Sequence, residues 1–377
     1  SDVCSSDLLG RRLHLPVSAQ ENLPSFASSA MDGFALGTPC PQGSWQVVEE
    51  VAAGQVPQTS LEAGQCSRIF TGAMLPLGTW SVIAQEDCQR QGDLVTCSAE
   101  VQPGQHMRPA GEHCQVHEVL LPSGQILTSA GLGMAAFLGY SQLSCWPSPR
   151  VALLSTGDEL VEVDQQPAPA QLRNSNAYAM QAQVSACGGR AIRLPIVADD
   201  PKLIRRAIED ALGQADLLVT CGGASVGERD YIQSVLRDMG ADLRLWKAAM
   251  RPGKPLGFAC LQGKSIVALP GNPVSCYVAF ELFVRPLLDK LQGGPGLGLR
   301  STTVALGQPV RKKVGLRFFY RCNIRDGRVF LAGEQGSHLF RSIAESCGLL
   351  ELDESSESLP PGRMVRVLLW PWIHGID

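Results

Sequence analysis

Between residues 151 and 291 the sequence alternates continuous apolar runs with amphipathic stretches, and this pattern limits the possible folds more than any other feature. The apolar runs are VALLS, RAIRLPIV, DLLVT and SIVAL, and each one leads into a loop. Helical stretches follow in ADDPKLIRRAIEDALGQA, CGGASVGERDYIQSVLRDMG and PGNPVSCYVAFELFVRPLLDKL. Continuous apolar strands that alternate with helices are typical of a parallel sheet covered on both faces. We therefore predict an α/β domain with a central parallel sheet.

Two of these stretches have clear helical periodicity. One apolar face carries Ile204, Ala207, Ile208, Ala211 and Leu212, and the other carries Ile232, Val235, Leu236 and Met239. Asp200 followed by Pro201 is a capping residue before a proline, which predicts where the first of these helices begins.

The segments on either side of this region have a different character. Up to about Trp146 the chain has short β-like runs broken by Gly and Pro, with one expected helix in SAGLGMAAFLGY. The prolines of WPSPR, residues 146–150, break regular structure and indicate a boundary. Short β runs return after the linker QGGPGLGLR, residues 292–300. Because 377 residues exceed a single compact core, we predict a multidomain α/β protein with small, mostly β flanking domains.

Composition excludes several classes of function. A net charge of -4 with 18% charged residues gives no electrostatic reason to expect a nucleic-acid or membrane partner. The first residues have no continuous apolar segment after a basic one, so we expect no secretory signal. The 13 cysteines are scattered singly, without a CxxC pair. We interpret them as reduced thiols and expect a cytoplasmic protein.

Three glycine-containing loops follow predicted strands: STGDEL (155–160), GGASVGERD (222–230) and LPGNPVS (269–275). In an open parallel sheet, ligands bind beyond the carboxyl ends of the strands, so these loops should meet at one site. Glycines allow backbone N–H groups to approach an oxyanion, and a helix N-terminus adds its dipole. We predict an anion site with Ser225 as a side-chain donor and Asp230 beside it, although tight turns also need glycine for geometry alone.

Acidic residues surround these loops, at Asp158, Glu159, Asp199, Asp200 and Asp230. Close carboxylates repel one another unless a cation lies among them, and hard oxygen ligands suit Mg²⁺. Three cations occur in WKAAMRPGKPLGF, at Lys247, Arg251 and Lys254. They suit a phosphate or another multiply charged oxyanion, and the alternative is a solvated charged turn. Phosphate, Mg²⁺ and acids together indicate phosphoanhydride or adenylate chemistry.

These stretches, together with SSAMDGFAL (28–36), TGAMLP (71–76) and QGSHLFRS (335–342), resemble the molybdopterin molybdenumtransferase family. That family includes the C-terminal catalytic half of gephyrin, and the resemblance runs in order from about Leu15 to the C-terminus. It implies insertion of molybdate into the dithiolene of adenylated molybdopterin, with Mg²⁺-dependent release of AMP. It also implies a homodimer whose sites combine both chains, and partners that include the upstream adenylyltransferase and acceptor molybdoenzymes.

The resemblance carries specific roles to residues of this chain. It implies that the catalytic residues are Asp32, Thr71, Glu159, Asp230, Lys247, Arg251 and Lys254. Of these, Asp32 and Thr71 are expected to contribute to the site of the partner chain in the dimer. The resemblance and the acidic pattern together indicate three metal ligands, Asp230, Glu159 and Asp200. The expected substrate-binding residues are Ser155, Gly157, Asp158, Gly222, Gly223, Ser225, Gly227, Pro270, Gly271, Asn272, Pro273, Ser275, Arg321 and Ser337. Arg251 stands where the family commonly has lysine, which keeps the charge and changes the donor geometry.

The resemblance also implies four domains. They are a linking and dimerisation region at 1–17 and 116–148, a small β-rich domain at 18–115, the molybdopterin-binding α/β domain at 149–294, and a small β-barrel-like domain at 295–377. The chain departs from the family at its start, where most of a helix and extended arm is missing and weaker dimerisation is expected. It also has His113 in RPAGEHC where the family pattern has an acid, and an imidazole does not replace a hard Mg²⁺ ligand.

Two alternatives remain at this point. A molybdopterin adenylyltransferase has a similar parallel-sheet domain, but that family is essentially the one domain. A non-catalytic scaffold on the same fold is the second alternative. The retained Asp32, Asp230, Lys247 and Lys254 favour the enzyme over the scaffold.

Overall fold

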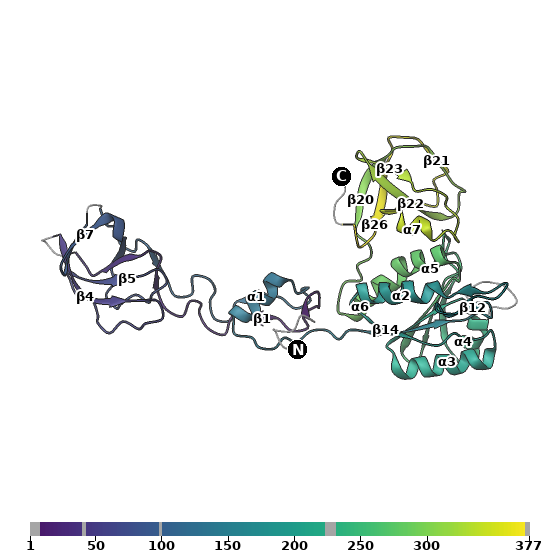
Figure 1. Cartoon of the computed structure of the whole chain (residues 1–377), viewed down its shortest axis with the longest axis horizontal. Helices are drawn as coiled ribbons and strands as arrows, with labels where there is room; N and C mark the ends of the chain where they lie inside the picture. The colour runs from purple at the N-terminus through teal and green to yellow at the C-terminus, as the bar shows by residue number, and fades with distance from the viewer. Residues whose placement is uncertain (1–7, 40–42, 98–99, 223–230, 374–377) are drawn as a thin grey trace. The chain divides into compact units, whose positions relative to one another are not determined.

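The computed structural model describes residues 8–39, 43–97, 100–222 and 231–373, and the chain divides into two compact units. The first unit comprises residues 1–9 and 13–145, and the second comprises residues 10–12 and 146–377. Figure 1 labels their helices and strands. No helix among the described residues is both long enough and apolar enough to span a bilayer.

The first unit contains a six-stranded, mostly antiparallel sheet in the order β6-β3-β5-β4-β8-β7. Its strands are β3 (Gly33–Leu36), β4 (Ser44–Val51), β5 (Gln65–Ile69), β6 (Ser81–Ala84), β7 (Cys88–Gln91) and β8 (Leu94–Cys97). Apolar residues pack on both faces of the sheet: Ala35 and Ile69 belong to one cluster, and Phe34 and Trp45 belong to the other. This alternation along β3 follows from the two-residue period of a strand.

A separate apolar cluster in the first unit contains the helix that the sequence predicted in SAGLGMAAFLGY. That helix is α1 (Ser129–Phe137), and it begins where the Thr128 hydroxyl accepts a hydrogen bond from the Gly131 N–H. Strands β1 (Val17–Ser18) and β10 (Val119–Leu121) pair beside it. Leu13, Leu127 and Ala135 are buried in this cluster.

The second unit contains the predicted α/β sheet, in the order β14-β11-β15-β19-β18-β16. Four strands are parallel: β11 (Arg150–Ser155), β14 (Arg190–Arg193), β15 (Leu217–Cys221) and β19 (Lys264–Leu269). The sheet also has two antiparallel strands that the sequence analysis did not predict, β18 (Gly257–Leu261) next to β19 and β16 (Asp242–Trp246) at the edge. Strands β18 and β19 form an antiparallel hairpin with a two-residue turn, so their pairing needs no crossover helix.

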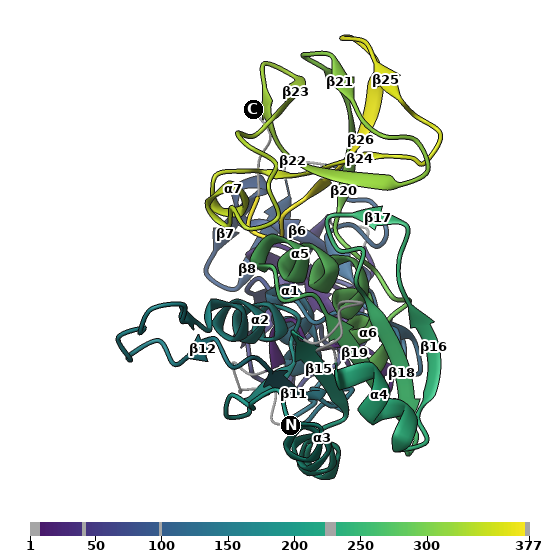
Figure 2. The same cartoon turned by 90° about the vertical axis from the view of Figure 1, so that its right-hand side faces the viewer.

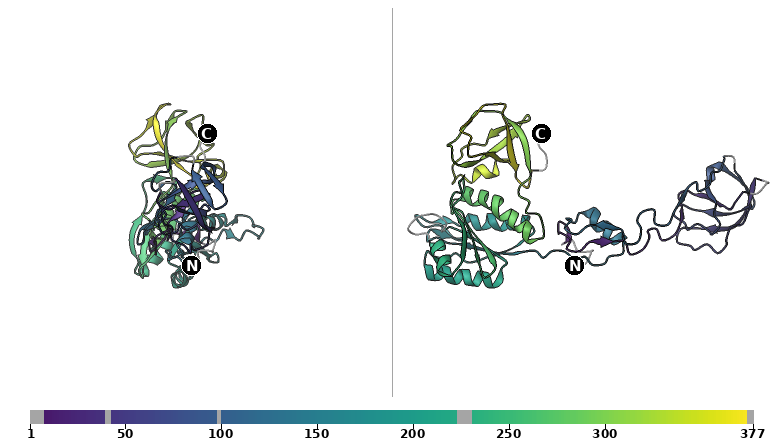
Figure 3. Two further views of the ribbon diagram at one scale, coloured as in Figure 1. Left: turned by 90° about the vertical axis from the view of Figure 1, so that its left-hand side faces the viewer. Right: turned by 180° about the vertical axis from the view of Figure 1, so that it is seen from behind.

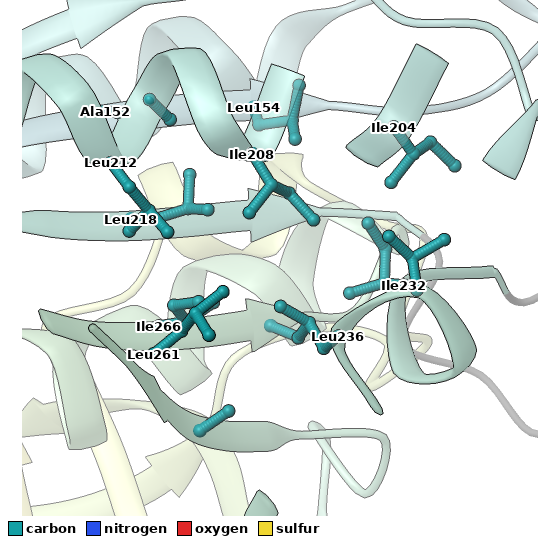
Figure 4. Close-up of a cluster of buried hydrophobic side chains, with 14 of the residues drawn as sticks. Ala152, Leu154, Ile204, Ile208, Leu212, Leu218, Ile232, Leu236, Leu261 and Ile266 are labelled. Atoms are coloured by element: carbon teal, nitrogen blue, oxygen red, sulfur yellow. The ribbon is translucent and has the colours of Figure 1, made fainter. Parts of the chain in front are cut away.

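Helices cover both faces of this sheet, as predicted (Figure 2). One face packs against α3 (Pro201–Gln214) and α4 (Tyr231–Asp238), and Figure 4 shows the cluster that contains Ile204, Ile208 and Leu212 of α3 with Ile232 and Leu236 of α4. The predicted start of α3 is confirmed, because Asp200 Oδ1 accepts from the N–H groups of Lys202 and Leu203.

The other face packs against α2 (Ser175–Ala186), α5 (Pro273–Ala279) and α6 (Arg285–Leu291), with a π-helical turn, η3 (Phe280–Val284), between the last two. Pro286 has no N–H to donate to the preceding turn, and the helix widens just before it. The chain does not enter a helix directly after β11. A loop with the short strands β12 (Leu160–Val161) and β13 (Leu172–Arg173) comes first.

The C-terminal part of the second unit is a closed β-barrel, shown in yellow-green in Figure 3. The strands β22 (Arg317–Arg325), β23 (Arg328–Leu331), β20 (Ser301–Leu306), β26 (Met364–Leu369) and β24 (Gly348–Leu352) pair in that order, and β24 pairs back to β22. A buried cluster joins the barrel to α5, where Tyr277 meets the fully buried Trp370 edge-on at 5.5 Å. The short strand β17 (Met250–Arg251) also pairs with β22, so a segment of the α/β domain extends the barrel sheet.

Candidate functional site

A cleft of about 710 Å³ lies at the carboxyl ends of the parallel strands. The strands β11, β15 and β19 end at Ser155, Cys221 and Leu269, and the residues that follow each of them line the cleft. The first turn of α2 lines it as well. Parallel strands bring their carboxyl ends to one edge, which is why loops far apart in the sequence meet here.

Seven of the residues expected from the sequence line this cleft: Gly157, Glu159, Gly222, Pro270, Gly271, Asn272 and Pro273. Gly222 requires glycine, because its φ is +92° and a Cβ there would lie 2.5 Å from the Thr156 carbonyl oxygen. This close approach places the end of β15 directly against the loop that follows β11.

Other expected residues lie elsewhere. Ser155 and Ser275 are buried and do not line the cleft, and the Ser155 hydroxyl donates to Asn174 Oδ1 at 3.3 Å. Asp158 is exposed, and its Oδ1 accepts from the Asp199 N–H at 3.1 Å. Asp200 uses Oδ1 to cap α3 and is not among the cleft-lining residues, whereas its neighbour Asp199 is. Gly223, Ser225, Gly227 and Asp230 lie outside the described residues.

Sequence reasoning missed the residues around the start of α2. Asn174 is its N-cap and accepts from the Ala177 N–H. Asn176 Nδ2 donates to the Gly271 carbonyl at 2.7 Å and to Cys221 Sγ at 3.1 Å. This one side chain therefore ties the ends of β15 and β19 to α2. The run RNSN before an apolar helix is an N-cap signal that could have pointed to this segment.

Thr156 was also missed. Thr156 is 4% exposed, and its hydroxyl oxygen is buried and makes no hydrogen bond within the described part of the chain. It lines the cleft beside Gly222. A buried hydroxyl without a partner costs free energy, so this group is available to a ligand or to water in the cleft.

The basic segment leads to a second, smaller pocket of about 140 Å³, lined by Arg251, Pro252, Phe318, Phe319, Tyr320, Arg321 and Gln335. Arg251 reaches it because β17 pairs with β22, and its guanidinium lies over the Phe318 ring at 5.8 Å. No carboxylate is among its described lining residues. Lys247 and Lys254 are exposed on the same segment but line neither this pocket nor the cleft.

Arg321 was expected as a substrate contact, and the structure shows that it is almost completely buried, with 1% exposed. Its guanidinium donates to the Ser342 hydroxyl at 3.0 Å and to the carbonyls of Glu334 and Gly336 at 3.3 and 3.1 Å. It forms no ion pair with a described residue, and burial, with the nearby charge of Arg251, lowers its pKa to about 10. A buried cation without a counterion is what an anion-binding pocket would contain.

Ser337 lies in the loop that Arg321 holds. Its carbonyl accepts from the Val274 N–H at 3.1 Å, which fastens this barrel loop to the first turn of α5. The next residue, His338, lines the cleft. The loop 335–338 therefore contributes Gln335 to the small pocket and His338 to the cleft, and the segment 251–255 likewise contributes Arg251 to the pocket and Pro255 to the cleft.

The two expected residues of the first unit form an exposed pair. The N–H and the hydroxyl of Thr71 both donate to Asp32 Oδ1, each at 2.7 Å. These hydrogen bonds lower the pKa of Asp32, which stays an anion at neutral pH. His113 packs edge-on against Phe137 at 4.9 Å in the same unit.

The described residues contain no group of three or more His, Cys, Asp or Glu side chains arranged to hold a metal. The cleft does have two carboxylates among its lining residues, Glu159 and Asp199. Mg²⁺ in proteins is commonly bound by one or two carboxylates together with substrate phosphates and water. The donor set therefore fits a cation that arrives with a phosphate-bearing ligand.

Three family models match successive parts of the chain. Residues 2–139 match the MoeA N-terminal region (domain I and II), residues 152–290 match a probable molybdopterin binding domain, and residues 303–370 match the MoeA C-terminal region (domain IV). A strand-end cleft in a sheet domain of this kind, with β domains before and after it, defines a multidomain enzyme class of molybdenum cofactor biosynthesis.

Relatives over most of the chain narrow this class. The molybdopterin molybdenumtransferase of Haemophilus influenzae is 34% identical over 375 residues, which are 97% of this chain and 90% of that protein. That of Nostoc sp. is 36% identical over 294 residues, 75% of this chain and 67% of that protein. The crystal structure of the molybdopterin biosynthesis moeA protein from Pyrococcus horikoshii superposes with a TM-score of 0.87 at 26% identity, covering 98% of this chain and 93% of that one. The chain belongs to the molybdopterin molybdenumtransferase family, which confirms the resemblance seen in the sequence.

Proposed function

We propose that this protein transfers molybdenum from molybdate to the dithiolene of adenylated molybdopterin and releases AMP. One observation carries the proposal: two segments, 251–255 and 335–338, each contribute residues to both the cleft and the small pocket. The cleft of about 710 Å³ is large enough for a nucleotide-linked ligand. The pocket of about 140 Å³ suits a compact tetrahedral oxyanion.

The residues of the small pocket supply what molybdate needs. Molybdate is a dianion, and two arginines, Arg251 and Arg321, are among the residues that line this pocket. A guanidinium donates several N–H groups in a fixed plane and stays charged at neutral pH, so it holds an oxyanion in one orientation. Ser337 lies on the loop that Arg321 holds and is not itself among the lining residues of the pocket; we propose it as a donor to the same anion. Lys247 and Lys254 raise the positive potential of the segment.

The residues of the cleft would hold the adenylated pterin. The N-terminus of α2 favours negative charge, and Gly222 lets the end of β15 lie directly against the Thr156 carbonyl in the lining of the cleft. We also propose Mg²⁺ as the cofactor, held by Glu159 and Asp199 with Asp230 from the glycine loop. When bound, Mg²⁺ would neutralise the negative charge that develops on the phosphate as AMP leaves. Asp200, expected as a metal ligand, has one oxygen committed to the cap of α3.

We propose that the active form is a homodimer, to which each chain offers its exposed Asp32–Thr71 pair, and that the chain works between an adenylyltransferase and acceptor molybdoenzymes. A mixing experiment tests the shared site. Asp32→Asn and Glu159→Gln chains are each expected to be inactive. If sites combine both chains, random mixing creates one intact site in every mixed dimer and restores about a quarter of wild-type activity. If both residues act within one chain, mixing restores nothing.

The transfer reaction is tested by AMP release from adenylated molybdopterin, with and without molybdate and Mg²⁺. Cofactor formed in parallel is measured by reconstitution of an apo-molybdoenzyme. Molybdate-dependent release that is lost in Glu159→Gln supports the proposal. ATP-dependent adenylation of molybdopterin would instead indicate an adenylyltransferase, and tight binding without turnover would indicate a scaffold.

A further inference from the structure

One loop of the barrel, residues 334–340, is held rigidly although it contains no helix or strand. At its start, Arg321 binds the carbonyls of Glu334 and Gly336. Gln335 adds two more contacts, since its Oε1 accepts from the Arg321 N–H at 2.9 Å and its Nε2 donates to the Arg321 carbonyl at 3.0 Å. Buried polar groups with this many partners give a loop a single conformation.

The other end of the loop is fixed by packing. The Ser337 carbonyl accepts from the Val274 N–H, and the Phe340 ring lies 5.9 Å from the ring of Tyr277. The interior of the loop is tight as well, because a Cβ at Gly336 would lie 3.0 Å from His338 Cε1. His338 is exposed between these two attachments and lines the cleft.

A chain of contacts leads from His338 to the start of α2. Ser337 is bonded to Val274 in the first turn of α5, and α5 begins just after Gly271. The Gly271 carbonyl accepts from Asn176 in the first turn of α2. The imidazole and the N-terminus of this 12-residue helix are therefore parts of one connected wall of the cleft.

This wall carries the hydrogen-bond donors of the cleft. Asn174 caps the Ala177 N–H, and the N–H groups of Ser175 and Asn176 have no partner among the described residues. The buried Thr156 hydroxyl, on the loop after β11, is a further cleft-lining group without a partner in the described part of the chain. The carboxylates Glu159 and Asp199 also line the cleft. The unpaired N–H groups and the helix dipole favour an anionic group at the start of α2.

We propose that His338 contacts a phosphate group of the substrate against the N-terminus of α2, so that the barrel takes part directly in recognition of the nucleotide-linked ligand. This inference rests on the proposed function only for the identity of that ligand. An imidazole N–H donates to a phosphate oxygen as a charge-assisted hydrogen bond. The barrel loop thereby contributes Gln335 to the oxyanion pocket and His338 to the phosphate contact.

The test compares AMP with adenosine as probes of the full-length protein by isothermal titration calorimetry. His338→Ala is expected to weaken AMP binding roughly tenfold and to leave adenosine binding unchanged, because adenosine has no phosphate. His338→Gln, which keeps an N–H donor, should retain part of the AMP affinity. Arg341→Ala is the matched control, since that nearby side chain is 85% exposed and does not line the cleft. It should bind both probes as the wild type does.

Urea unfolding curves of each variant confirm that the folded state is retained. Equal AMP affinity in His338→Ala and the wild type, or equal losses of AMP and adenosine affinity, would overturn the inference. So would a wild-type protein that binds no AMP. Molybdate-dependent AMP release by the wild type decides the proposed function separately. If His338→Ala binds AMP normally and the wild type turns over normally, the phosphate contact of His338 is rejected and the proposed function stands.

Discussion

Replacing Arg321 by methionine removes a buried cation for which the described residues provide hydrogen bonds but no carboxylate. Methionine has a similar length and no charge, so it fills the space while it removes every donor. Two opposing contributions decide what happens to the free energy of unfolding. The hydrogen bonds to Ser342, Glu334 and Gly336 are lost, and the cost of burying the charge is recovered.

The structure sets the size of both contributions. At about 1.5 kcal/mol each, the lower end of the range for hydrogen bonds to a charged group, three such bonds contribute roughly 4 to 5 kcal/mol. A pKa of about 10 in the folded state, against 12.5 in the unfolded chain, corresponds to about 3 kcal/mol by which burial disfavours the charged form. We therefore expect Arg321→Met to lower the free energy of unfolding by only about 1 to 2 kcal/mol. Molybdate binding should lose about 3 kcal/mol, which is roughly a hundredfold in Kd.

The two effects are measured separately. Urea unfolding gives the stability of the variant, and equilibrium dialysis with metal analysis gives its Kd for molybdate. Arg317→Met is the control, because this arginine lies on the same strand and makes ion pairs with Glu351 and Glu354 on the surface. It should bind molybdate normally. If Arg321→Met loses more than about 4 kcal/mol of stability but its folded fraction binds molybdate as the wild type does, Arg321 is only a structural residue.

Further predictions concern pH and two side-chain contacts. Burial lowers the pKa of Arg321 to about 10, and the proposed molybdate contact needs its charged form. Molybdate affinity should therefore be unchanged between neutral pH and about 9 and fall as the pH rises through about 10; a constant Kd up to pH 11 would contradict this. Thr71→Val should raise the pKa of Asp32, because one of the two hydrogen bonds that lower it is lost, and carboxyl chemical shifts followed by NMR check this. Because the folded pKa of Asp32 is lowered, its stabilising contribution is present above the unfolded pKa and is lost as the pH falls through the folded pKa. Asp200→Ala should destabilise α3 by about 1 kcal/mol. Asp200→Ser keeps a capping oxygen and should have both the stability and the AMP release of the wild type. Lost AMP release in Asp200→Ser would show that the carboxylate itself is needed, as a metal ligand would be.

Much of the α/β domain could be predicted because its signals are local. The start of α3 depends on Asp200 and Pro201, which act within one helical turn, and its buried face follows from the 3.6-residue period. The loops that line the cleft could be predicted for a related reason. Each follows a continuous apolar strand, and parallel strands place such loops at one edge whatever the rest of the chain does.

Other features depend on which distant segments pair, and the sequence does not specify pairing locally. The pairing of β17 with β22 places Arg251 opposite Phe318 and in the pocket that Arg321 also lines, although about 70 residues separate the two arginines. The same tertiary packing buries Arg321, which the resemblance suggested as a substrate contact, and lets its guanidinium hold the loop 334–340 through hydrogen bonds. Asn176 also links segments that are distant in the sequence, since its two hydrogen-bond partners lie at the end of β15 and just after β19. Periodicity and caps determined the elements of this protein, and long-range pairing and burial decided which side chains meet at its site.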